Sequence, residues 1–530
     1  MTASAVTTGP DSGPDSRPGS RSAAAISSQL RGSSLLTLGK LLAVAANLGI
    51  QVLIVRYLTK SAYGAFAYAL SLVTMLSTLI TLGIQRAIPR FAAMYDEKGE
   101  YGKLAGTFVL QLGTIGVLGL SAILFTLGLR QWLTNSVIGD AEVVGVLTIL
   151  VLLAPLQALD STALSVFAVY SRPRAIFFRR YVVTPALRFA VVAVLIAGGL
   201  DERALALGWV LIGAAGLGIY AVMLRDLFST QHLGSKLRSK SFEIPYREVL
   251  GFALPLLTTD ILFVLLNTAD VVLINRYGST ADVGSFRAVQ PAAKMNQFVM
   301  TSFALLYTPV VARHFSRGDR AGVSDLYWRT ASWITVLTFP VLILTFSLSG
   351  PLTETLFGAE YSGSAVFMAL LAVGYYFNAA LGFNGLTVKT YGRVGYSVAI
   401  SSAAAVTNVV LNVLLIPRYG PMGAALGTLA TLVAHNLLKQ LGLRLGTGIP
   451  LFRLSSLPLY TTVVVGAGGL YLLVERFDLS LATAGLPAVL TVVAVVAVAR
   501  RDLQVEDTFP ELARLPVIGR LASGAPETDR

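Results

Sequence analysis

The sequence contains no cysteine, which excludes disulfide bonds and thiol chemistry. Its three histidines, His232, His314 and His435, lie far apart and show no metal-ligand spacing, so no metal site is expected. A phosphate-binding Gly-x-x-x-x-Gly-Lys-Ser/Thr loop is absent, so the chain is not expected to hydrolyse ATP itself. No set of nucleophile and base stands out either. We therefore expect neither an enzyme nor a cofactor.

Charge is also scarce. Charged residues make up 13% of the chain and hydrophobic residues 55%, whereas soluble proteins average about 25% charged residues. Apolar runs recur at about the 20 residues that one helix needs to cross a bilayer. Because a backbone in lipid must satisfy its own hydrogen bonds, these runs predict membrane-spanning helices. We expect fourteen spans, near residues 34–57, 64–88, 104–129, 145–169, 182–200, 204–224, 249–275, 284–308, 328–349, 364–385, 394–416, 421–443, 457–474 and 481–499.

One stretch of sequence occurs twice. The segments Asn47–Phe66 and Asn267–Phe286 share an initial Asn, an Arg-Tyr pair and a Gly at identical spacing, and residues 415–420 repeat part of the pattern. Apolar matches are common in such a hydrophobic chain, but shared Asn, Arg-Tyr and Gly are not. We interpret the two segments as an internal duplication.

The duplication predicts an all-α polytopic membrane protein with two six-helix lobes, related as parallel repeats, and two additional helices. Lys and Arg concentrate in the loops that follow even-numbered spans, which predicts a cell-membrane protein with both termini in the cytoplasm. Six helices per lobe then give both lobes one orientation. The expected units are a disordered cytoplasmic tail (1–33), an N-lobe (34–224), a basic cytoplasmic connector (225–248), a C-lobe (249–443), two C-terminal helices (457–499) and a cytoplasmic tail (500–530).

The formal net charge of +13 could indicate a nucleic-acid partner. The basic residues lie between apolar helices, however, as they do in cytoplasmic loops of membrane proteins. We therefore interpret the charge as a topology signal and expect no nucleic acid.

Polar residues inside the predicted spans are the candidates for function, because a central Arg, Lys or Asp costs about 2.5–3.5 kcal/mol to insert. Basic residues outnumber acidic ones there, which favours an anionic substrate, and the planar fork of Arg suits phosphate. The substrate-binding candidates are Lys40, Asn47, Arg86, Arg188, Asn267, Arg287 and Lys294, and the candidates for ion coupling are Asp160, Asp260 and Asp270.

Structural roles compete with these assignments. Arg86 could mark only the cytoplasmic end of its span, and Asn47 and Asn267 could form hydrogen bonds between helices. Asp270 could pair with Lys294. The four basic residues that are hardest to explain as membrane anchors are Lys40, Arg188, Arg287 and Lys294.

Three motifs carry a resemblance to a known family. They are residues 55–64 (VRYLTKSAYG), residues 251–255 (GFALP) with the downstream Asp270 and Val283-Gly284, and residues 412–428 (NVLLIPRYGPMGAALGT). The chain resembles Wzx-type polysaccharide-biosynthesis flippases of the multidrug/oligosaccharidyl-lipid/polysaccharide exporter superfamily over about residues 30–500. The resemblance implies two lobes in a V around a central cavity. It also implies that a polyprenyl-phosphate- or polyprenyl-diphosphate-linked oligosaccharide moves to the outer leaflet by alternating access, for surface polysaccharide biosynthesis.

Other functions remain open at this point. A cation-coupled exporter of small molecules would have the same fold and use a carboxylate in the first lobe, which keeps Asp160 of interest. A membrane polymerase or ligase would need a large outer loop, whereas the predicted outer loops are short. A flippase for a cell-wall precursor or another lipid is not excluded. The expected partners are the lipid-linked glycan, membrane lipids and a polysaccharide polymerase or glycosyltransferases.

Overall fold

The computed structural model describes residues 39, 42–170, 176–230 and 242–503, and nearly all of these residues are helical. Within these ranges there is no β-strand. The predicted tail 1–33, Lys40, part of the connector 225–248 and most of the tail 500–530 lie outside the described residues.

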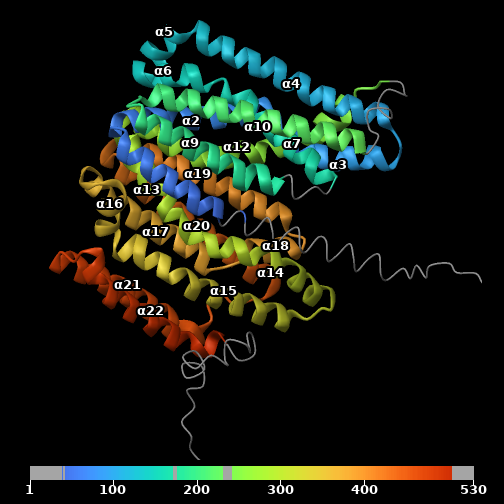
Figure 1. Ribbon diagram of the computed structural model, residues 1–530. Helices are drawn as coiled ribbons and strands as arrows, with labels where there is room; N and C mark the ends of the chain where they lie inside the picture. Colours follow the sequence, from blue (N-terminus) through green and yellow to red (C-terminus); the bar gives the residue numbers. More distant parts are fainter. Residues whose placement is uncertain (1–38, 40–41, 171–175, 231–241, 504–530) are drawn as a thin grey trace, which may run out of the picture.

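The N-lobe helices occupy one side of the molecule and the C-lobe helices the other (Figure 1). The N-lobe begins with an unlabelled helix, Leu42–Tyr57. It continues with α2 (Lys60–Ile80), α3 (Ile84–Glu97), α4 (Tyr101–Gly128), α5 (Arg130–Trp132), η1 (Leu133–Ile138), α6 (Ala141–Leu150), α7 (Leu153–Val169), η2 (Phe178–Val183), α9 (Thr184–Ala197) and α10 (Glu202–Thr230).

The C-lobe repeats this plan and is followed by two further helices. The C-lobe consists of α12 (Tyr246–Tyr277), α13 (Thr280–Lys294), η3 (Met295–Gln297), α14 (Phe298–Ser316), α15 (Arg320–Leu342), η4 (Ile343–Ser347), α16 (Ser349–Phe357), η5 (Ala359–Ser364), α17 (Ala365–Ala380), α18 (Asn384–Thr390), α19 (Val394–Tyr419) and α20 (Pro421–Thr447). The short turn η6 (Leu454–Ser456) leads into α21 (Leu457–Phe477), and α22 (Leu481–Leu503) follows. This arrangement confirms the predicted all-α fold with two lobes and two C-terminal helices.

Twelve of the described helical stretches are long and apolar enough to cross a membrane, compared with the fourteen spans predicted. The two remaining predicted spans are also helical. Leu42–Tyr57 is a shorter apolar helix, and α13 continues through the 3-10 turn η3 into α14. The continuous described part of the first begins only at Leu42. The second carries Arg287, Gln290 and Lys294, which lower its hydropathy.

The second predicted span, 64–88, is not one continuous helix. It forms α2 and α3, separated by a turn in which Leu82 and Gly83 have φ angles of 45° and 72°. The carbonyl oxygen of Ala253 on α12 lies 2.6 Å from where a Cβ on Gly83 would be. Glycine is therefore required twice over, for the left-handed backbone and for the close approach of the C-lobe.

The lobes meet along α2 and α13 at one end and along α3 and α12 at the other. Both α2 and α13 begin after a hydroxyl side chain at the same place in the duplicated segments. Thr59 accepts a hydrogen bond from the Ala62 amide, and Ser279 forms a capping box with Asp282. Such caps satisfy amide groups that the first helical turn leaves unpaired. The duplicated turns therefore start the two helices that pack against each other.

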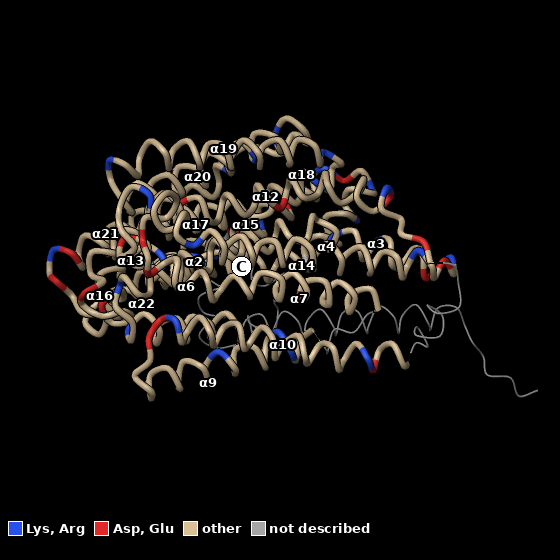
Figure 2. The backbone as a smooth tube through the Cα atoms, turned by 90° about the horizontal axis from the view of Figure 1, so that it is seen from above, with Lys and Arg blue, Asp and Glu red and all other residues tan. Residues whose placement is uncertain are grey.

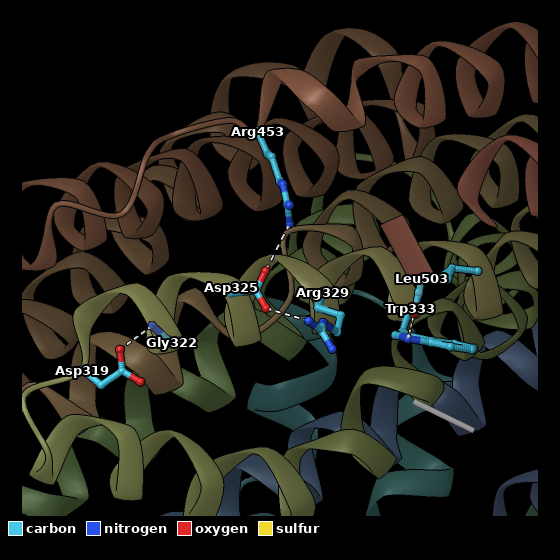
Figure 3. A network of polar contacts seen from close by, with 7 residues as sticks. All are labelled: Asp319, Gly322, Asp325, Arg329, Trp333, Arg453 and Leu503. Carbon is cyan, nitrogen blue, oxygen red and sulfur yellow. Dashed lines mark hydrogen bonds and ion pairs between the residues drawn. The ribbon is translucent and has the colours of Figure 1, made fainter. Parts of the chain in front are cut away.

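The C-terminal pair α21 and α22 lies on the far side of the C-lobe from the N-lobe (Figure 1). Its attachment to α15 is partly polar (Figure 3). Arg453, just before α21, lies 3.7 Å from Asp325. The indole of Trp333 donates a 3.1 Å hydrogen bond to the carbonyl of Leu503 at the end of α22. Asp319 caps the start of α15 by accepting from the Gly322 amide at 2.8 Å.

Candidate functional site

Charged residues gather toward the two ends of the long helices, with few along the middle (Figure 2). The exceptions in the middle form three groups. One lies on α12 and α13 of the C-lobe, one lies inside the N-lobe, and one joins α3 to α12. Because charges at membrane depth are costly unless they face protein, water or ligand, these groups are where function is expected.

The C-lobe group brings four of the predicted residues together. Lys294 donates to the side-chain oxygen of Asn267 at 3.4 Å, and its Nζ lies 6.0 Å from the ring centre of Tyr375. Arg287 donates to Gln290 at 2.8 Å, and Gln290 donates in turn to Asp270 at 3.3 Å. Asp270 therefore accepts a hydrogen bond from Gln290. The Lys294 ammonium donates to Asn267 and does not form the pair with Asp270 that the sequence left open.

Arg287 also reaches the N-lobe. Its Nη2 donates to Ser71 on α2 at 3.0 Å and to the backbone carbonyl of Asn267 at 3.0 Å. In the opposite direction, Gln51 donates to the backbone carbonyl of Arg287 at 3.1 Å. The guanidinium therefore lies at the seam between the lobes, where a bound anion would touch both of them.

The N-lobe group is built around two arginines and one carboxylate. Arg188 on α9 donates to the side-chain oxygen of Asn47 at 2.9 Å and lies 5.7 Å from the ring centre of Trp209. Asp160 on α7 forms a 2.5 Å ion pair with Arg179 on η2. Asp160, Arg179, Arg188 and Trp209 line a cavity of about 250 Å³.

Asn47 and Asn267 occupy the same place in the duplicated segments and adopt the same conformation. Each amide nitrogen donates to the carbonyl four residues earlier, at 2.6 Å for Asn47 and 2.7 Å for Asn267. Each side-chain oxygen is then left to accept from a cation, Arg188 in the N-lobe and Lys294 in the C-lobe. The duplication therefore placed one cation-orienting asparagine in each lobe, although the cations come from different helices.

The third group joins the lobes where α3 packs against α12. Arg86 forms a close ion pair with Asp260, whose side chain is only 8% exposed. Tyr95 donates to Glu248 at 2.8 Å in the same seam. Asp260 therefore belongs to an interlobe contact, separate from Asp270.

Sequence reasoning missed several members of these groups. The sequence predicts Arg179 in a cytoplasmic loop ahead of the span 182–200, but the apolar helical stretch already includes Phe178 and only 7% of Arg179 is exposed. Its position beside an Arg-rich turn made it look like a topology signal. Gln51, Ser71 and Tyr375 are uncharged, and nothing in their sequence context distinguished them. Lys40 lies outside the described residues.

A second cavity, of about 570 Å³, lies between α15, η4, α17 and α21. Its wall is almost entirely apolar, with Phe346, Phe377 and Val464 among its lining residues, and Arg453 is the charged residue in that lining. This composition suits a hydrocarbon chain. Among the described residues, no group of three His, Asp or Glu side chains could hold a metal ion.

Residues 53–366 match the sequence profile of a family described as "Polysaccharide biosynthesis protein". The chain belongs to this family. The match confirms the resemblance inferred from the sequence motifs, and it includes Arg188, Arg287 and Lys294.

Individual proteins are also similar to this chain. An uncharacterized membrane protein of Methanocaldococcus jannaschii is 24% identical over 167 residues, which cover 31% of this chain and 32% of that protein. The chain thus spans about a third of that relative's length. The fold of this chain is similar to that of the lipid II flippase MurJ in an inward closed conformation. The TM-score is 0.67 at 12% identity, and the match covers 90% of this chain and 100% of MurJ.

Two transporter structures share the fold as well. An inward-facing multidrug resistance MATE family transporter of the MOP superfamily has a TM-score of 0.61 and 13% identity, covering 76% of this chain and 94% of that one. A mutant of the Vibrio cholerae MATE transporter VcmN has a TM-score of 0.51 and 14% identity, covering 79% and 96%. At these identities the likeness establishes the fold alone.

Proposed function

We propose that this polysaccharide biosynthesis protein is a flippase for a polyprenyl-phosphate- or polyprenyl-diphosphate-linked oligosaccharide. The substrate moves from the cytoplasmic to the outer leaflet by alternating access, and both termini of the chain are cytoplasmic. The protein acts as a transporter and not as an enzyme. Its partners are the lipid-linked glycan, membrane lipids and the glycosyltransferases or polymerase that make and use the glycan.

The observation that carries this proposal is the position of Arg287 and Lys294. Arg287 lies at the seam of the lobes and its hydrogen bonds reach Ser71 in one lobe and Gln290 in the other. The present partners of this guanidinium are uncharged, whereas a phosphate bound there would supply negative charge and could accept two parallel hydrogen bonds from the planar fork. Lys294 adds a second positive group on the same helix, as a point charge beside the planar fork of Arg287.

An apolar cavity beside α21 supports a lipid-linked substrate. Its volume of about 570 Å³ and its apolar wall fit part of a prenyl chain. A lipid II flippase is among the solved structures that share this fold, which also favours a lipid carrier. In this arrangement the phosphate and sugars are held by polar groups while the tail stays among apolar side chains.

A cation-coupled exporter of small molecules is the second candidate, because Asp160 lines a cavity in the N-lobe. Arg179 neutralises this carboxylate at 2.5 Å, and Arg188 lines the same cavity. An excess of positive charge disfavours a cationic substrate. The family's description as polysaccharide biosynthesis proteins also supports the flippase.

Translocation in reconstituted vesicles tests the proposal. A fluorescent polyprenyl-diphosphate oligosaccharide is placed in one leaflet, and its arrival on the other face is followed with and without a proton or sodium gradient. Protein-dependent arrival is expected, and it should fall in an Arg287→Gln variant but not in Arg276→Gln, which changes an exposed arginine at the end of the preceding helix. Gradient-driven export of a small cation without glycan movement would assign the chain to the exporter branch.

A further inference from the structure

The cavity inside the N-lobe is separate from the Arg287–Lys294 group. It is lined by residues of α2, α7, η2, α9 and α10, and its volume is about 250 Å³. Pockets for drug-sized ligands occupy about 300–1,000 Å³. The N-lobe cavity is therefore suited to a single ring or a group of that size.

The charges in this cavity do not balance. Two guanidinium groups, Arg179 and Arg188, face one carboxylate, Asp160. The Nε atoms of both arginines are buried and have no hydrogen-bond partner among the described residues. Leaving a buried donor unpaired costs about 1–3 kcal/mol, and more when the group is charged. Asp160 pairs with Arg179, and one of its oxygens also has no hydrogen-bond partner. A second negative charge, to balance Arg188, is what this set of residues lacks.

The position of Arg179 is built into the fold. Its guanidinium lies directly over Gly216 on α10, where a Cβ would overlap Nη2. It also stacks 4.9 Å from the ring centre of Tyr220 and donates to Thr184 at 3.2 Å. With only 7% of the residue exposed, Arg179 cannot act as a surface anchor.

The rest of the lining suits a sugar ring. Trp209 supplies an aromatic side chain, and Gln157 and Thr74 add groups that can donate to or accept from hydroxyls. Specific pockets for small molecules combine apolar or aromatic walls with a few placed polar groups. Two guanidinium groups in such a pocket select a ring that carries an oxyanion, such as a carboxylate.

The cavity also lies close to the Arg287 group. Thr74 lines the cavity, and Ser71, three residues earlier on α2, accepts from Arg287. At 1.5 Å rise per residue, this separation along the helix is about 4.5 Å. On the helix Leu42–Tyr57, Asn47 accepts from Arg188, and Gln51 one turn later donates to the backbone carbonyl of Arg287. One head group could therefore reach both sites.

We propose that the N-lobe cavity is a subsite for one acidic sugar of the transported head group, whose carboxylate accepts hydrogen bonds from Arg179 and Arg188. The inference rests on the proposed flippase function. It specifies the substrate class: a lipid-linked oligosaccharide that carries a uronic acid near its phosphate end. Arg287 and Lys294 bind the phosphate, and the N-lobe cavity binds the carboxylate.

The test compares two substrates that differ in one sugar. Polyprenyl-diphosphate oligosaccharides with either glucuronate or glucose as that sugar are reconstituted with the full chain, and their translocation rates are measured. The wild type should move the acidic substrate about tenfold faster. Arg179→Gln should remove this preference by slowing the acidic substrate alone, and Arg180→Gln, which changes the exposed neighbouring arginine, should keep it.

Because Arg179→Gln leaves Asp160 unpaired, Asp160→Asn/Arg179→Gln provides a second variant in which both charges are removed. Equal rates for the two substrates in the wild type would overturn the acidic-sugar subsite while leaving the flippase proposal standing. Movement of neither substrate would overturn the flippase proposal itself.

Direct binding separates the chemistry of the subsite from transport. Glucuronate should bind the purified chain, as measured by calorimetry, and glucose should not. The double variant should lose glucuronate binding at least tenfold. If inorganic phosphate binds at the same residues and glucuronate does not, the cavity takes a phosphate group and the acidic-sugar assignment is wrong.

Discussion

Gly64 and Gly284 form a reciprocal contact across the seam between the lobes. A Cβ on Gly64 would overlap the carbonyl oxygen of Thr280, and a Cβ on Gly284 would overlap the carbonyl oxygen of Lys60. Gly64 and Gly284 are equivalent in the duplicated segments, and so are Lys60 and Thr280. The contact therefore maps onto itself when the lobes are exchanged, as a pseudo-two-fold axis requires.

Substituting either glycine should separate α2 from α13. Gly284→Val introduces a side chain where backbone atoms already lie, and overpacking of this kind costs about 1–3 kcal/mol. We expect a lower unfolding temperature for the purified protein. Gly113→Ala on α4 is the matched control, because nothing lies within 4 Å of its added Cβ. Equal unfolding temperatures for Gly284→Val and the wild type would show that the contact is not tight.

Orientation in the membrane can be tested with single cysteines, because the chain has none of its own. We predict that a cysteine at Ser316 is labelled only from the cytoplasmic side and one at Tyr419 only from outside. Both residues are exposed at the ends of helices. Labelling intact cells with a membrane-impermeant maleimide, before and after permeabilisation, measures this directly. The reverse pattern would invert the topology predicted from Lys and Arg.

The fold was largely predictable because its signals are local and repeated. Apolar runs predicted where helices lie, and the shared Asn, Arg-Tyr and Gly identified the duplication that later appeared as the Gly64–Gly284 contact. The break between α2 and α3 was not predicted. It depends on how closely Ala253 of the other lobe approaches Gly83, and such a tertiary distance leaves no periodic signal in the sequence.

The candidate site was only partly predictable. Charges inside apolar spans pointed to Arg188, Arg287 and Lys294, because their burial is costly wherever they lie. How they group depends on neighbours that are far away in sequence. Arg179 looked like a loop residue, yet the space over Gly216 on α10 allows it to be buried beside Asp160.

The start of α15 should be sensitive to acid. Asp319 accepts hydrogen bonds from the Gly322 amide and from His314, which together lower the pKa of its carboxyl below the ordinary value of 3.8. A lowered folded pKa means that the stabilisation is fully present above pH 3.8 and is lost as the pH falls through the folded value. We expect Asp319→Ala to lower the unfolding temperature at about pH 6 and the difference to vanish in strong acid. A difference that grows on acidification would contradict this assignment.

Lys294→Ala and Arg188→Ala should each slow translocation of a lipid-linked glycan without reducing membrane insertion. A hydrogen bond to a charged group contributes about 1.5–3 kcal/mol, which corresponds to a loss of roughly tenfold to a hundredfold. Rates measured at matched protein levels in vesicles test this, with Arg276→Ala as a control for loss of positive charge. Unchanged rates in both variants would remove Lys294 and Arg188 from the site.

The Arg86–Asp260 ion pair should stabilise the contact between the two lobes. Asp260 is 8% exposed, whereas Arg86 is 46% exposed. Removing the arginine leaves a carboxylate buried without its partner, so Arg86→Gln should destabilise the protein by about 1–3 kcal/mol. Asp260→Asn should cost less, because the arginine that loses its partner can still reach water.

The exchanged variant Arg86→Asp/Asp260→Arg should recover part of the stability lost in Arg86→Asp, because it restores opposite charges across the same seam. The interaction free energy from a double-mutant cycle of unfolding measurements quantifies the contribution of the pair.

If the lobes must separate here for the site to open, variants that weaken the pair should also change how accessible the residues of this seam are to a labelling reagent. A single cysteine at Arg90, labelled with and without Asp260→Asn, reports that change. A zero interaction free energy, together with unchanged labelling, would mean that the two residues are neighbours without being coupled.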